Sequence, residues 1–497
     1  MTTALLHVAT GDRERTAVID PSGSYTYGRL DTDAWRVANA LLAHRQTLAG
    51  ARVAYLVTAG YQYAAVQEGI WRAGGVAVPL ALSHPLPELE YVLRDTAAEI
   101  VVCDAPARAR LGSLPADVGV RLLMVEDLLA GAPAVRDCGV SPTDSALIVY
   151  TSGTTGKPKG VVSTHANLAA QVGSLLEAWE WSAADRLLLV LPLHHIHGIL
   201  NGLRSALAAR ATCEIQPDFD VDHCWSRLAS GEITVFTAVP TVYQRLIAGW
   251  DAVSAEDRCR FSTGAAAARL MMSGSAALPV PVLQRWREIS GHTLLERYGM
   301  TEIGMALSNP LRGDRRAGAV GVPLPGVEVR LVSEDGQPVG NGSPGELEVR
   351  GPSVFKEYWQ RPAETEAAFR AGYFRTGDMA VLEDGMYRLL GRTSVDIIKT
   401  GGFKVSAVEI ENALRDHAAI AACAVVGVPS DEWGETIAAA VELRAGASLT
   451  LPELQEWARA RLAPYKIPRD LLIVTALPQN VMGKTIKSEV RRLFQGR

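Results

Sequence analysis

A loop rich in glycine, hydroxyl and lysine side chains offers the clearest chemistry in this chain. It follows the apolar run 146–149 and reads Tyr-Thr-Ser-Gly-Thr-Thr-Gly-Lys-Pro-Lys-Gly over residues 150–160. Glycines let backbone N–H groups approach an anion, hydroxyls donate to phosphate oxygens, and lysines add positive charge. The spacing is not that of a Walker A loop, because Lys157 is followed by proline. A flexible surface turn is the alternative, although linkers rarely combine such residues with a preceding buried strand.

A second candidate site is the segment 297–302, which reads Arg-Tyr-Gly-Met-Thr-Glu. It continues an apolar approach, so Thr301 and Glu302 are expected where a strand ends and a ligand pocket can open. A carboxylate beside a triphosphate normally holds Mg²⁺, which prefers oxygen ligands. Glu302 is the carboxylate of this segment, and a turn in which it is merely solvated is the alternative.

Arg297 narrows the class of ligand. On an extended strand it projects away from Tyr298. A guanidinium inside a pocket implies a carboxylate on the ligand, because a buried unpaired charge is costly. Pairing of Arg297 with Glu296 or with another acid at the surface is equally consistent with the local sequence.

Three further motifs lie toward the C-terminus. Thr-Gly-Asp ends at Asp378, which lies 14 residues before Arg392. A carboxylate can accept from both hydroxyls of a ribose, and an arginine can neutralise phosphate. Lys-Thr-Gly-Gly begins at Lys399, and Asn-Val-Met-Gly-Lys ends at Lys484. Taken singly, these motifs are also consistent with ordinary turns and an exposed lysine.

Composition indicates a globular protein of more than one domain. A chain of 497 residues is longer than a single hydrophobic core usually serves. A composition of 48% hydrophobic and 21% charged residues is typical of folded proteins. The net charge of −5 gives no reason to expect nucleic acid or an anionic membrane as partner. No apolar run reaches the roughly 18 residues that span a bilayer. The N-terminus lacks a leader pattern and the six cysteines form no Cys-x-x-Cys pair, so we expect a cytoplasmic protein with reduced thiols.

Strand-like and helix-like stretches alternate in the first part of the chain, which favours parallel α/β layers. The expected strands there are 52–57, 75–78, 99–102 and 121–125. Between residues 318 and 351 the pattern changes to period two around turn-rich segments, which predicts an antiparallel β subdomain.

A domain boundary is expected at Gly391 and Arg392. Beyond it, the residue pattern predicts a helix over 406–417, a strand over 420–428 and a helix over 451–462. We therefore predict an α/β fold with a large N-terminal domain (1–391) of layered α/β subdomains plus a β subdomain. A small, mobile α+β domain (392–497) follows, of a size normal for an independent unit.

Taken in order, these motifs resemble those of the adenylate-forming enzymes, which comprise acyl- and aryl-CoA synthetases, luciferases and peptide-synthetase adenylation domains. The resemblance runs from about Tyr25 to Lys487. It implies an AMP-forming acid–thiol ligase that uses ATP, Mg²⁺ and coenzyme A.

The resemblance also implies roles for individual residues. The implied catalytic residues are Lys484, Thr301 and Glu302. Lys484 would stabilise charge on the reacting carboxylate and the α-phosphate. The implied ATP-binding residues are Thr151, Ser152, Gly153, Thr154, Thr155, Gly156, Lys157, Tyr298, Gly299, Met300, Thr301, Asp378, Arg392 and Lys484. Thr155 and Glu302 would bind Mg²⁺, and Lys399, Gly401 and Gly402 would bind coenzyme A. Arg297, His195 and Ser273 would bind the substrate carboxylate.

Four segments together resemble malonyl-CoA synthetases, a group whose animal mitochondrial member also uses methylmalonate. These segments are 191–198, 273–279, 296–302 and 394–402. In this interpretation His195 lines the acyl pocket, and the small, hydroxyl-bearing segment 273–279 suits a short acid. The expectation is ATP-dependent ligation of malonate, and also of methylmalonate, to coenzyme A through an acyl-adenylate.

Other functions stay open at this stage. One is a synthetase for a short monocarboxylic acid, in which Arg297 is structural. Another is a stand-alone adenylation module that loads a carrier protein. A catalytically silent binding protein is disfavoured because Lys484, Asp378, Arg392 and Glu302 are all present. The residues do not predict the oligomeric state.

Overall fold

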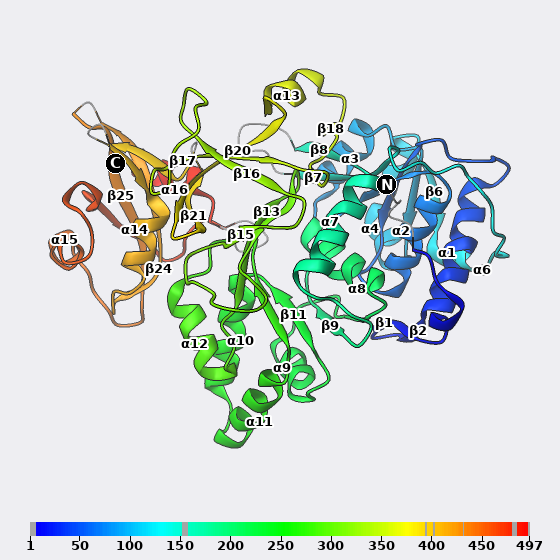
Figure 1. Cartoon of the computed structure of the whole chain (residues 1–497), viewed down its shortest axis with the longest axis horizontal. Coiled ribbons are helices and arrows are strands. Elements are labelled where there is room, and N and C mark those ends of the chain that lie inside the picture. The colour runs from blue at the N-terminus through cyan, green and yellow to red at the C-terminus, as the bar shows by residue number, and fades with distance from the viewer. Residues whose placement is uncertain are drawn as a thin grey trace.

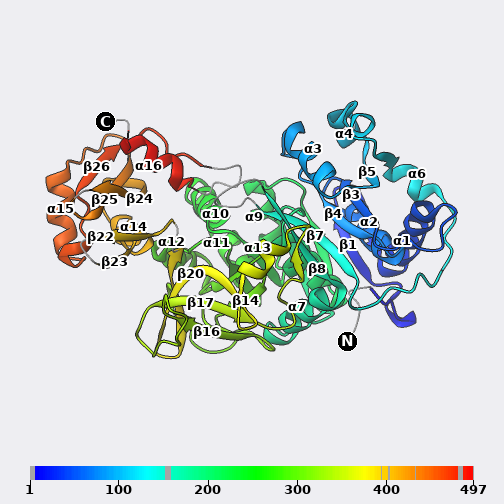
Figure 2. The same ribbon diagram turned by 90° about the horizontal axis from the view of Figure 1, so that it is seen from above.

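The computed structural model of the chain describes residues 6–151, 158–392, 395–400, 403–430, 432–479 and 485–495. These residues form four sheets, three in the larger N-terminal part and one in the smaller C-terminal part. Figure 1 shows the C-terminal part, coloured orange to red, at one end of the molecule. Figure 2, turned by 90°, shows it again at that end, beyond strands β16, β17 and β20.

A seven-stranded sheet lies in the N-terminal part in the order β18-β8-β7-β4-β3-β5-β6. Its central strands pair in parallel and are almost fully buried, as expected for a sheet with helices on both faces. The strands are β3 (Arg52–Leu56), β4 (Val76–Pro79), β5 (Ile100–Cys103), β6 (Arg121–Met124), β7 (Ser145–Thr151), β8 (Lys159–Thr164) and β18 (Glu357–Tyr358). The four strands predicted here are confirmed to within two residues.

A nine-stranded sheet has the order β15-β14-β13-β12-β11-β9-β10-β1-β2. The six strands from β13 to β1 are parallel, and antiparallel strands close both edges. The strands are β1 (Thr16–Asp20), β2 (Gly23–Thr26), β9 (Arg186–Leu189), β10 (Thr212–Ile215), β11 (Val235–Ala238), β12 (Leu270–Ser273), β13 (Leu295–Met300), β14 (Gly304–Ser308) and β15 (Val322–Pro323).

Helices cover these two sheets. Several begin at a hydroxyl or carboxylate that accepts from the first turn, such as Thr26, Asp104 and Thr164. They are α1 (Tyr27–Leu42), α2 (Tyr61–Arg72), α3 (Leu86–Asp95), α4 (Ala105–Leu111), α5 (Leu114–Asp117), α6 (Val125–Ala130), α7 (His165–Ala178), α8 (Ser205–Ala208), α9 (Val221–Ala229), α10 (Pro240–Ala252), α11 (Ala255–Ala266), α12 (Val280–Ser290) and α13 (Pro362–Ala367). A 3-10 turn, η1 (Thr10–Asp12), precedes β1, and a π-helix, η2 (His197–Arg204), precedes α8.

The predicted antiparallel β subdomain is present as a five-stranded sheet. Its strands are β16 (Glu328–Val332), β17 (Gly345–Arg350), β19 (Phe369–Arg370), β20 (Tyr373–Glu383) and β21 (Met386–Arg392). Strand β21 ends at Arg392, so the boundary predicted after residue 391 falls one residue before the end of this strand.

The C-terminal part is a second five-stranded sheet with helices, and it has hydrophobic clusters of its own. Its elements are β22 (Ile397–Thr400), β23 (Phe403–Ser406), α14 (Ala407–Leu414), β24 (Ile420–Ser430), β25 (Gly434–Leu443), α15 (Leu451–Arg459), the 3-10 turn η3 (Pro464–Lys466), β26 (Asp470–Ile473) and α16 (Lys487–Gln495). The predicted helices and strand are confirmed, and the α/β fold class with them. The hairpin strand β23, which lies between the motif at Lys399 and the predicted helix, was not expected.

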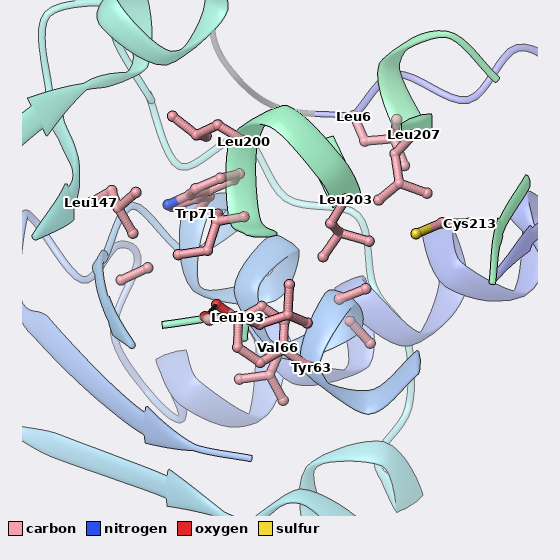
Figure 3. Close-up of a cluster of buried hydrophobic side chains, with 14 of the residues drawn as sticks. Leu6, Tyr63, Val66, Trp71, Leu147, Leu193, Leu200, Leu203, Leu207 and Cys213 are labelled. Atoms are coloured by element: carbon pink, nitrogen blue, oxygen red, sulfur yellow. Dashed lines mark hydrogen bonds between the residues drawn. The ribbon is translucent and has the colours of Figure 1, made fainter. Parts of the chain in front are cut away.

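The largest hydrophobic core holds the π-helix η2 against α2 and β7. In Figure 3, Trp71 of α2 lies between Leu147 of β7 and Leu200 of η2. The Trp71 indole donates to the Ala146 carbonyl at 2.6 Å. At the end of η2, Arg204 forms a buried ion pair of 2.8 Å with Glu68 and lies 4.7 Å from the Trp71 ring. The core therefore fixes η2, whose first residue is His197.

Candidate active site

The site opens where parallel strands of the nine-stranded sheet end. Ligands of open α/β sheets bind at the carboxyl ends of the strands. Thr237 lies near the end of β11, Arg297 lies in β13, and His197 begins the helix η2 that follows β9. One guanidinium nitrogen of Arg297, Nη2, donates to the Thr237 hydroxyl at 3.0 Å and contacts His197 Nε2. Three elements distant in sequence thus meet at one guanidinium.

Arg297 is buried without a carboxylate partner. Its exposed fraction is 2%, its Nη1 lies 3.4 Å from the Met305 sulfur, and its Nε has no hydrogen-bond partner. No Asp or Glu of the described segments lies within ion-pair distance of it. Burial lowers the pKa of Arg297 to about 10, so the side chain is still charged at neutral pH. A buried, unpaired cation costs several kcal/mol, so the surroundings of Arg297 favour an anionic ligand.

Glu296 does not pair with Arg297, although the two are neighbours. Successive side chains of a strand point to opposite faces. The Glu296 carboxylate accepts from the Leu278 backbone N–H at 3.0 Å, and burial raises its pKa to about 7. The alternative of a surface pair between Arg297 and Glu296 is therefore wrong.

Ser273 and His195, the other two residues predicted at the substrate carboxylate, do not contact Arg297 directly. Ser273 is in register with Glu296 on the neighbouring strand, so its side chain lies on the Glu296 face and not on the Arg297 face. Its hydroxyl is buried without a partner. His195 packs on His194, with ring centroids 4.2 Å apart, and burial lowers the pKa of His195 to about 4. The histidine that contacts Arg297 is His197.

Thr237 is a residue of the site that was not expected from the sequence, whereas Ser275 lies in the hydroxyl-bearing segment 273–279 that was expected to suit a short acid. Thr237 contacts both Arg297 and His197, and Ser275 Oγ lies 2.9 Å from His197 Nδ1. Both amide atoms of Asn201, on η2, are buried without a partner. The β-branched run 235–238 is a strand signal that could have found Thr237. The contact between Ser275 and His197 joins segments 78 residues apart and has no such local signal. Burial lowers the pKa of His197 well below its ordinary value, so its imidazole is neutral.

A second group of polar residues joins β13, β20 and β21. The Tyr298 hydroxyl donates to Asp378 Oδ2 at 2.6 Å, and Arg392 Nε donates to Asp378 Oδ1 at 3.0 Å. The antiparallel register of β20 and β21 places Asp378 opposite Arg392. Each carboxylate oxygen has two lone pairs, so Asp378 can still accept from a ribose diol. These contacts bring together three residues predicted to bind ATP.

Glu302 lies just after β13 and is buried. The Tyr358 hydroxyl donates to Glu302 Oε1 at 3.0 Å, and among the described residues no cationic group forms an ion pair with it. Burial raises the pKa of Glu302. A buried carboxylate with a single hydroxyl partner fits a divalent cation that carries most of its other ligands as phosphate and water. Thr301, Met300 and Gly299 lie beside it, at the end of β13 and in the following turn.

Both flanks of the glycine-rich loop are tied to helix α3. The Tyr150 hydroxyl donates to Asp95 Oδ2 at 2.6 Å, and the Tyr91 hydroxyl donates to the Pro158 carbonyl at 2.8 Å. Arg361 Nη2 donates to Tyr91 Oη at 3.3 Å and to Asp95 Oδ1 at 3.4 Å. Thr151 ends β7. The other predicted phosphate-binding residues lie outside the described residues: Ser152, Gly153, Thr154, Thr155, Gly156 and Lys157.

Lys484, Gly401 and Gly402 also lie outside the described residues, so their predicted roles stay predictions. Lys399 is exposed in β22, and its backbone N–H donates to Glu435 at 2.8 Å. The described part of the chain holds no cluster of three or more His, Cys, Asp or Glu arranged for a metal ion. It also contains no helix that is long and apolar enough to cross a membrane.

Comparison with known proteins places these features in context. The mitochondrial malonate–CoA ligase ACSF3 of Xenopus laevis is 44% identical over 518 residues, which cover 96% of this chain and 89% of that protein. The crystal structure of ATP-bound MatB from Rhodopseudomonas palustris superimposes with a TM-score of 0.91 at 35% identity, over 99% of both chains. A malonyl-CoA ligase ternary product complex with methylmalonyl-CoA and AMP superimposes with a TM-score of 0.71 at 37% identity, over 96% of this chain and 99% of that chain.

The family assignment covers both parts of the molecule. The AMP-binding enzyme family model matches residues 5–359, and the model of the AMP-binding enzyme C-terminal domain matches residues 409–484. The resemblance to adenylate-forming enzymes is thereby confirmed, and the chain belongs to the AMP-binding enzyme family.

Proposed function

We propose that this chain is an AMP-forming acyl-CoA ligase that joins malonate to coenzyme A at the expense of ATP. A relative of 44% identity is a malonate–CoA ligase, and MatB structures share the fold over nearly the full length. In the first half-reaction a carboxylate of malonate attacks the α-phosphate of ATP and pyrophosphate leaves. In the second, the thiol of coenzyme A attacks the acyl carbonyl of malonyl-AMP and AMP leaves.

The buried, unpaired guanidinium of Arg297 is the observation that carries the choice of acid. Malonate has a second carboxylate that does not react, and this group would pair with Arg297. Thr237, His197 and Met305 enclose the guanidinium, so water is a poor substitute for that carboxylate. A monocarboxylate would leave the buried charge unpaired, at a cost of several kcal/mol in the bound state. The rival function, a synthetase for a short monocarboxylic acid, therefore has less support.

The residues around the nucleotide would orient the reacting groups. Asp378 would accept from the ribose hydroxyls, Arg392 would neutralise phosphate, and Tyr298 would lie near the adenine. Glu302 and Thr155 would hold Mg²⁺, which would neutralise the pyrophosphate that leaves. Lys484 would stabilise negative charge in the transition state, where the carboxylate and the α-phosphate approach each other.

Several finer features belong to the same proposal. Methylmalonate would also be a substrate, because one additional methyl group changes binding by only about 1–3 kcal/mol. Gly401, Gly402 and Lys399 would bind coenzyme A, and residues 1–391 and 392–497 would form the two domains. A cytoplasmic location agrees with the six free thiols. Loading of a carrier protein is the second alternative, and no described feature favours it.

Pyrophosphate release with a panel of acids tests the proposed function. The assay would contain ATP, Mg²⁺ and coenzyme A with malonate, methylmalonate, succinate, acetate or hexanoate. We expect kcat/KM for malonate and methylmalonate to exceed that for acetate at least 100-fold. Activity mainly with acetate or hexanoate would retain the ligase chemistry and contradict the dicarboxylate pocket. Faster transfer to a phosphopantetheinylated carrier than to coenzyme A would favour the loading module.

A further inference from the structure

A buried group of charged side chains lies in the C-terminal part, away from the acid pocket. Lys487 Nζ lies 2.5 Å from Asp396 Oδ1 and 2.8 Å from Glu411 Oε1. The side chains of Lys487, Asp396 and Glu411 are 11%, 19% and 8% exposed. Arg415 lies 3.7 Å from the other oxygen of Glu411, so two cations balance two carboxylates. We call Lys487, Asp396 and Glu411 the buried triad.

The buried triad joins three elements that are far apart in the chain. Lys487 is the first residue of α16, Glu411 belongs to α14, and Asp396 immediately precedes β22. In Figure 2, α16 lies near the C-terminus beside strands β24 and β26. Glu411 Oε1 also accepts from the Val425 N–H of β24 at 2.8 Å. Lys487 thus links Asp396 to Glu411, and Glu411 is also tied to β24.

Asp396 connects the triad to Arg392. Its second oxygen, Oδ2, accepts from the Arg392 backbone N–H at 3.0 Å, and its own N–H donates to the Arg392 carbonyl at 2.7 Å. Gly391 makes this close approach feasible, because a Cβ there would lie 2.4 Å from the Asp396 Cβ and because its φ is +115°. The Arg392 side chain in turn holds Asp378. A continuous path of contacts thus runs from Lys487 to the residues predicted to bind the nucleotide.

Lys487 also marks the base of the segment that contains Lys484. Residues 480–484 lie outside the described residues, but both flanks of the segment are described. Gln479 and Thr485 form an antiparallel bridge, and the Ile486 N–H donates to the Pro478 carbonyl at 2.9 Å. Lys487 follows directly. Its ion pairs therefore fix the end of the chain segment closest to the predicted catalytic lysine.

Stability alone is a weak reason for such a triad. Apolar residues of similar volume often stabilise a core as well as a buried ion pair does, whereas directional ion pairs fix relative positions. Burial lowers the pKa of Lys487, but Glu411 and Asp396 outweigh burial and keep the pKa above its ordinary value. The amine therefore stays charged at neutral pH.

We propose that Lys487 is a positioning residue, which acts through Asp396 and Glu411 to hold the base of segment 480–484 in a fixed relation to Arg392 while the adenylate forms. This inference rests on the proposed function, because it assumes that Lys484 and Arg392 act together on ATP. Lys487 itself does not touch the substrates. Its loss should slow the chemical step and leave substrate binding nearly unchanged.

The first half-reaction, measured alone, tests this proposal. ATP–pyrophosphate exchange with malonate, without coenzyme A, would be followed in wild type and in Lys487→Met, Lys487→Arg, Asp396→Asn and the double variant Lys487→Met/Asp396→Asn. The exposed Lys356→Met is the matched control. We expect Lys487→Met to lower kcat about 10- to 100-fold with KM values for ATP and malonate within about twofold. Lys487→Arg should recover most of the rate, and the double variant should be no slower than the slower single variant.

A folded Lys487→Met protein with a wild-type kcat would overturn the proposal, as would effects of the two single variants that multiply in the double variant. If Lys487→Met does not fold, the kcat of Asp396→Asn tests the proposal instead. The amide oxygen of this variant can still accept from the Arg392 N–H. A fivefold or larger loss of its kcat supports the proposal and an unchanged kcat contradicts it. If wild type exchanges with another acid and not with malonate, the proposed function fails, and the same variants test Lys487 with that acid.

Discussion

At the scale of single residues, the chain accommodates two buried charges on neighbouring positions in opposite ways. Arg297 stays charged, since burial lowers its pKa only to about 10, and it has no anionic partner among the described residues. Glu296, on the other face of β13, is half-neutral near pH 7 because burial raises its pKa to about 7. The charged Arg297 is suited to an anionic ligand, whereas the raised pKa of Glu296 makes the stability of the fold depend on pH.

Glu296 should make the protein less stable as the pH rises from about 4.5 to 7. Over this range the unfolded chain loses the proton of Glu296 whereas the folded chain retains it, so the free energy of unfolding falls by about 3 kcal/mol. Glu296→Gln keeps the acceptor for the Leu278 N–H and should remove this loss. Thermal unfolding between pH 4.5 and 8 checks it, with the exposed Glu288→Gln as control. An equal pH dependence in wild type and Glu296→Gln would contradict the assignment.

At the scale of elements, the acid pocket depends on close packing between β12 and β13. Gly274 follows β12, and a Cβ at that position would lie 2.2 Å from Nη1 of Arg297. His197, Thr237 and Met305 contact the guanidinium, so a shift that relieves this clash would disturb these contacts. The glycine is therefore needed for the position of the guanidinium.

Gly274→Ala should displace Arg297 and weaken recognition of the second carboxylate. We expect kcat/KM for malonate to fall about tenfold or more, with a smaller change for propionate. Steady-state kinetics with both acids measure the effect. Gly173→Ala is the matched control, because a Cβ at that position of α7 meets nothing within 4 Å. An unchanged kcat/KM for malonate in Gly274→Ala would show that Arg297 does not hold the acid.

The elements were more predictable than the pocket. Apolar runs bounded by turn residues located β3, β5, α15 and others to within a few residues, because burial and periodicity are local properties. The serine of segment 273–279 that contacts His197 is Ser275, whereas Ser273 lies in register with Glu296 on the opposite face from Arg297. Strand register and the meeting of β9, β11 and β13 are long-range properties, and no local pattern contains them.

At the scale of the whole molecule, the chain superimposes better on one relative than on another. The TM-score is 0.91 with ATP-bound MatB and 0.71 with the methylmalonyl-CoA and AMP complex. Identity and coverage are similar in the two comparisons. A different relative position of the two parts in the two relatives would account for the difference, since the smaller C-terminal domain was expected to be mobile.

Distances between the two parts should therefore depend on the ligand. Cys259 is exposed and Glu456 lies on α15, so spin labels on Cys259 and on Glu456→Cys report this distance, with Cys138→Ser as background. We expect different distance distributions with a non-hydrolysable ATP analogue plus malonate and with AMP plus methylmalonyl-CoA. Labels on Cys259 and Glu88→Cys, both in the N-terminal part, should give one distribution. Identical distributions for the first pair of labels would contradict a rearrangement.

The central claim is that Arg297 binds the second carboxylate of malonate. The most direct test measures malonyl-CoA and propionyl-CoA by mass spectrometry, with wild type, Arg297→Met and the exposed control Arg312→Met. Arg297→Met should lower kcat/KM for malonate about 100- to 1,000-fold, equivalent to about 3–4 kcal/mol. Its melting temperature should not fall, since the variant removes a buried unpaired charge. A stable Arg297→Met enzyme that uses malonate as wild type does would contradict the account.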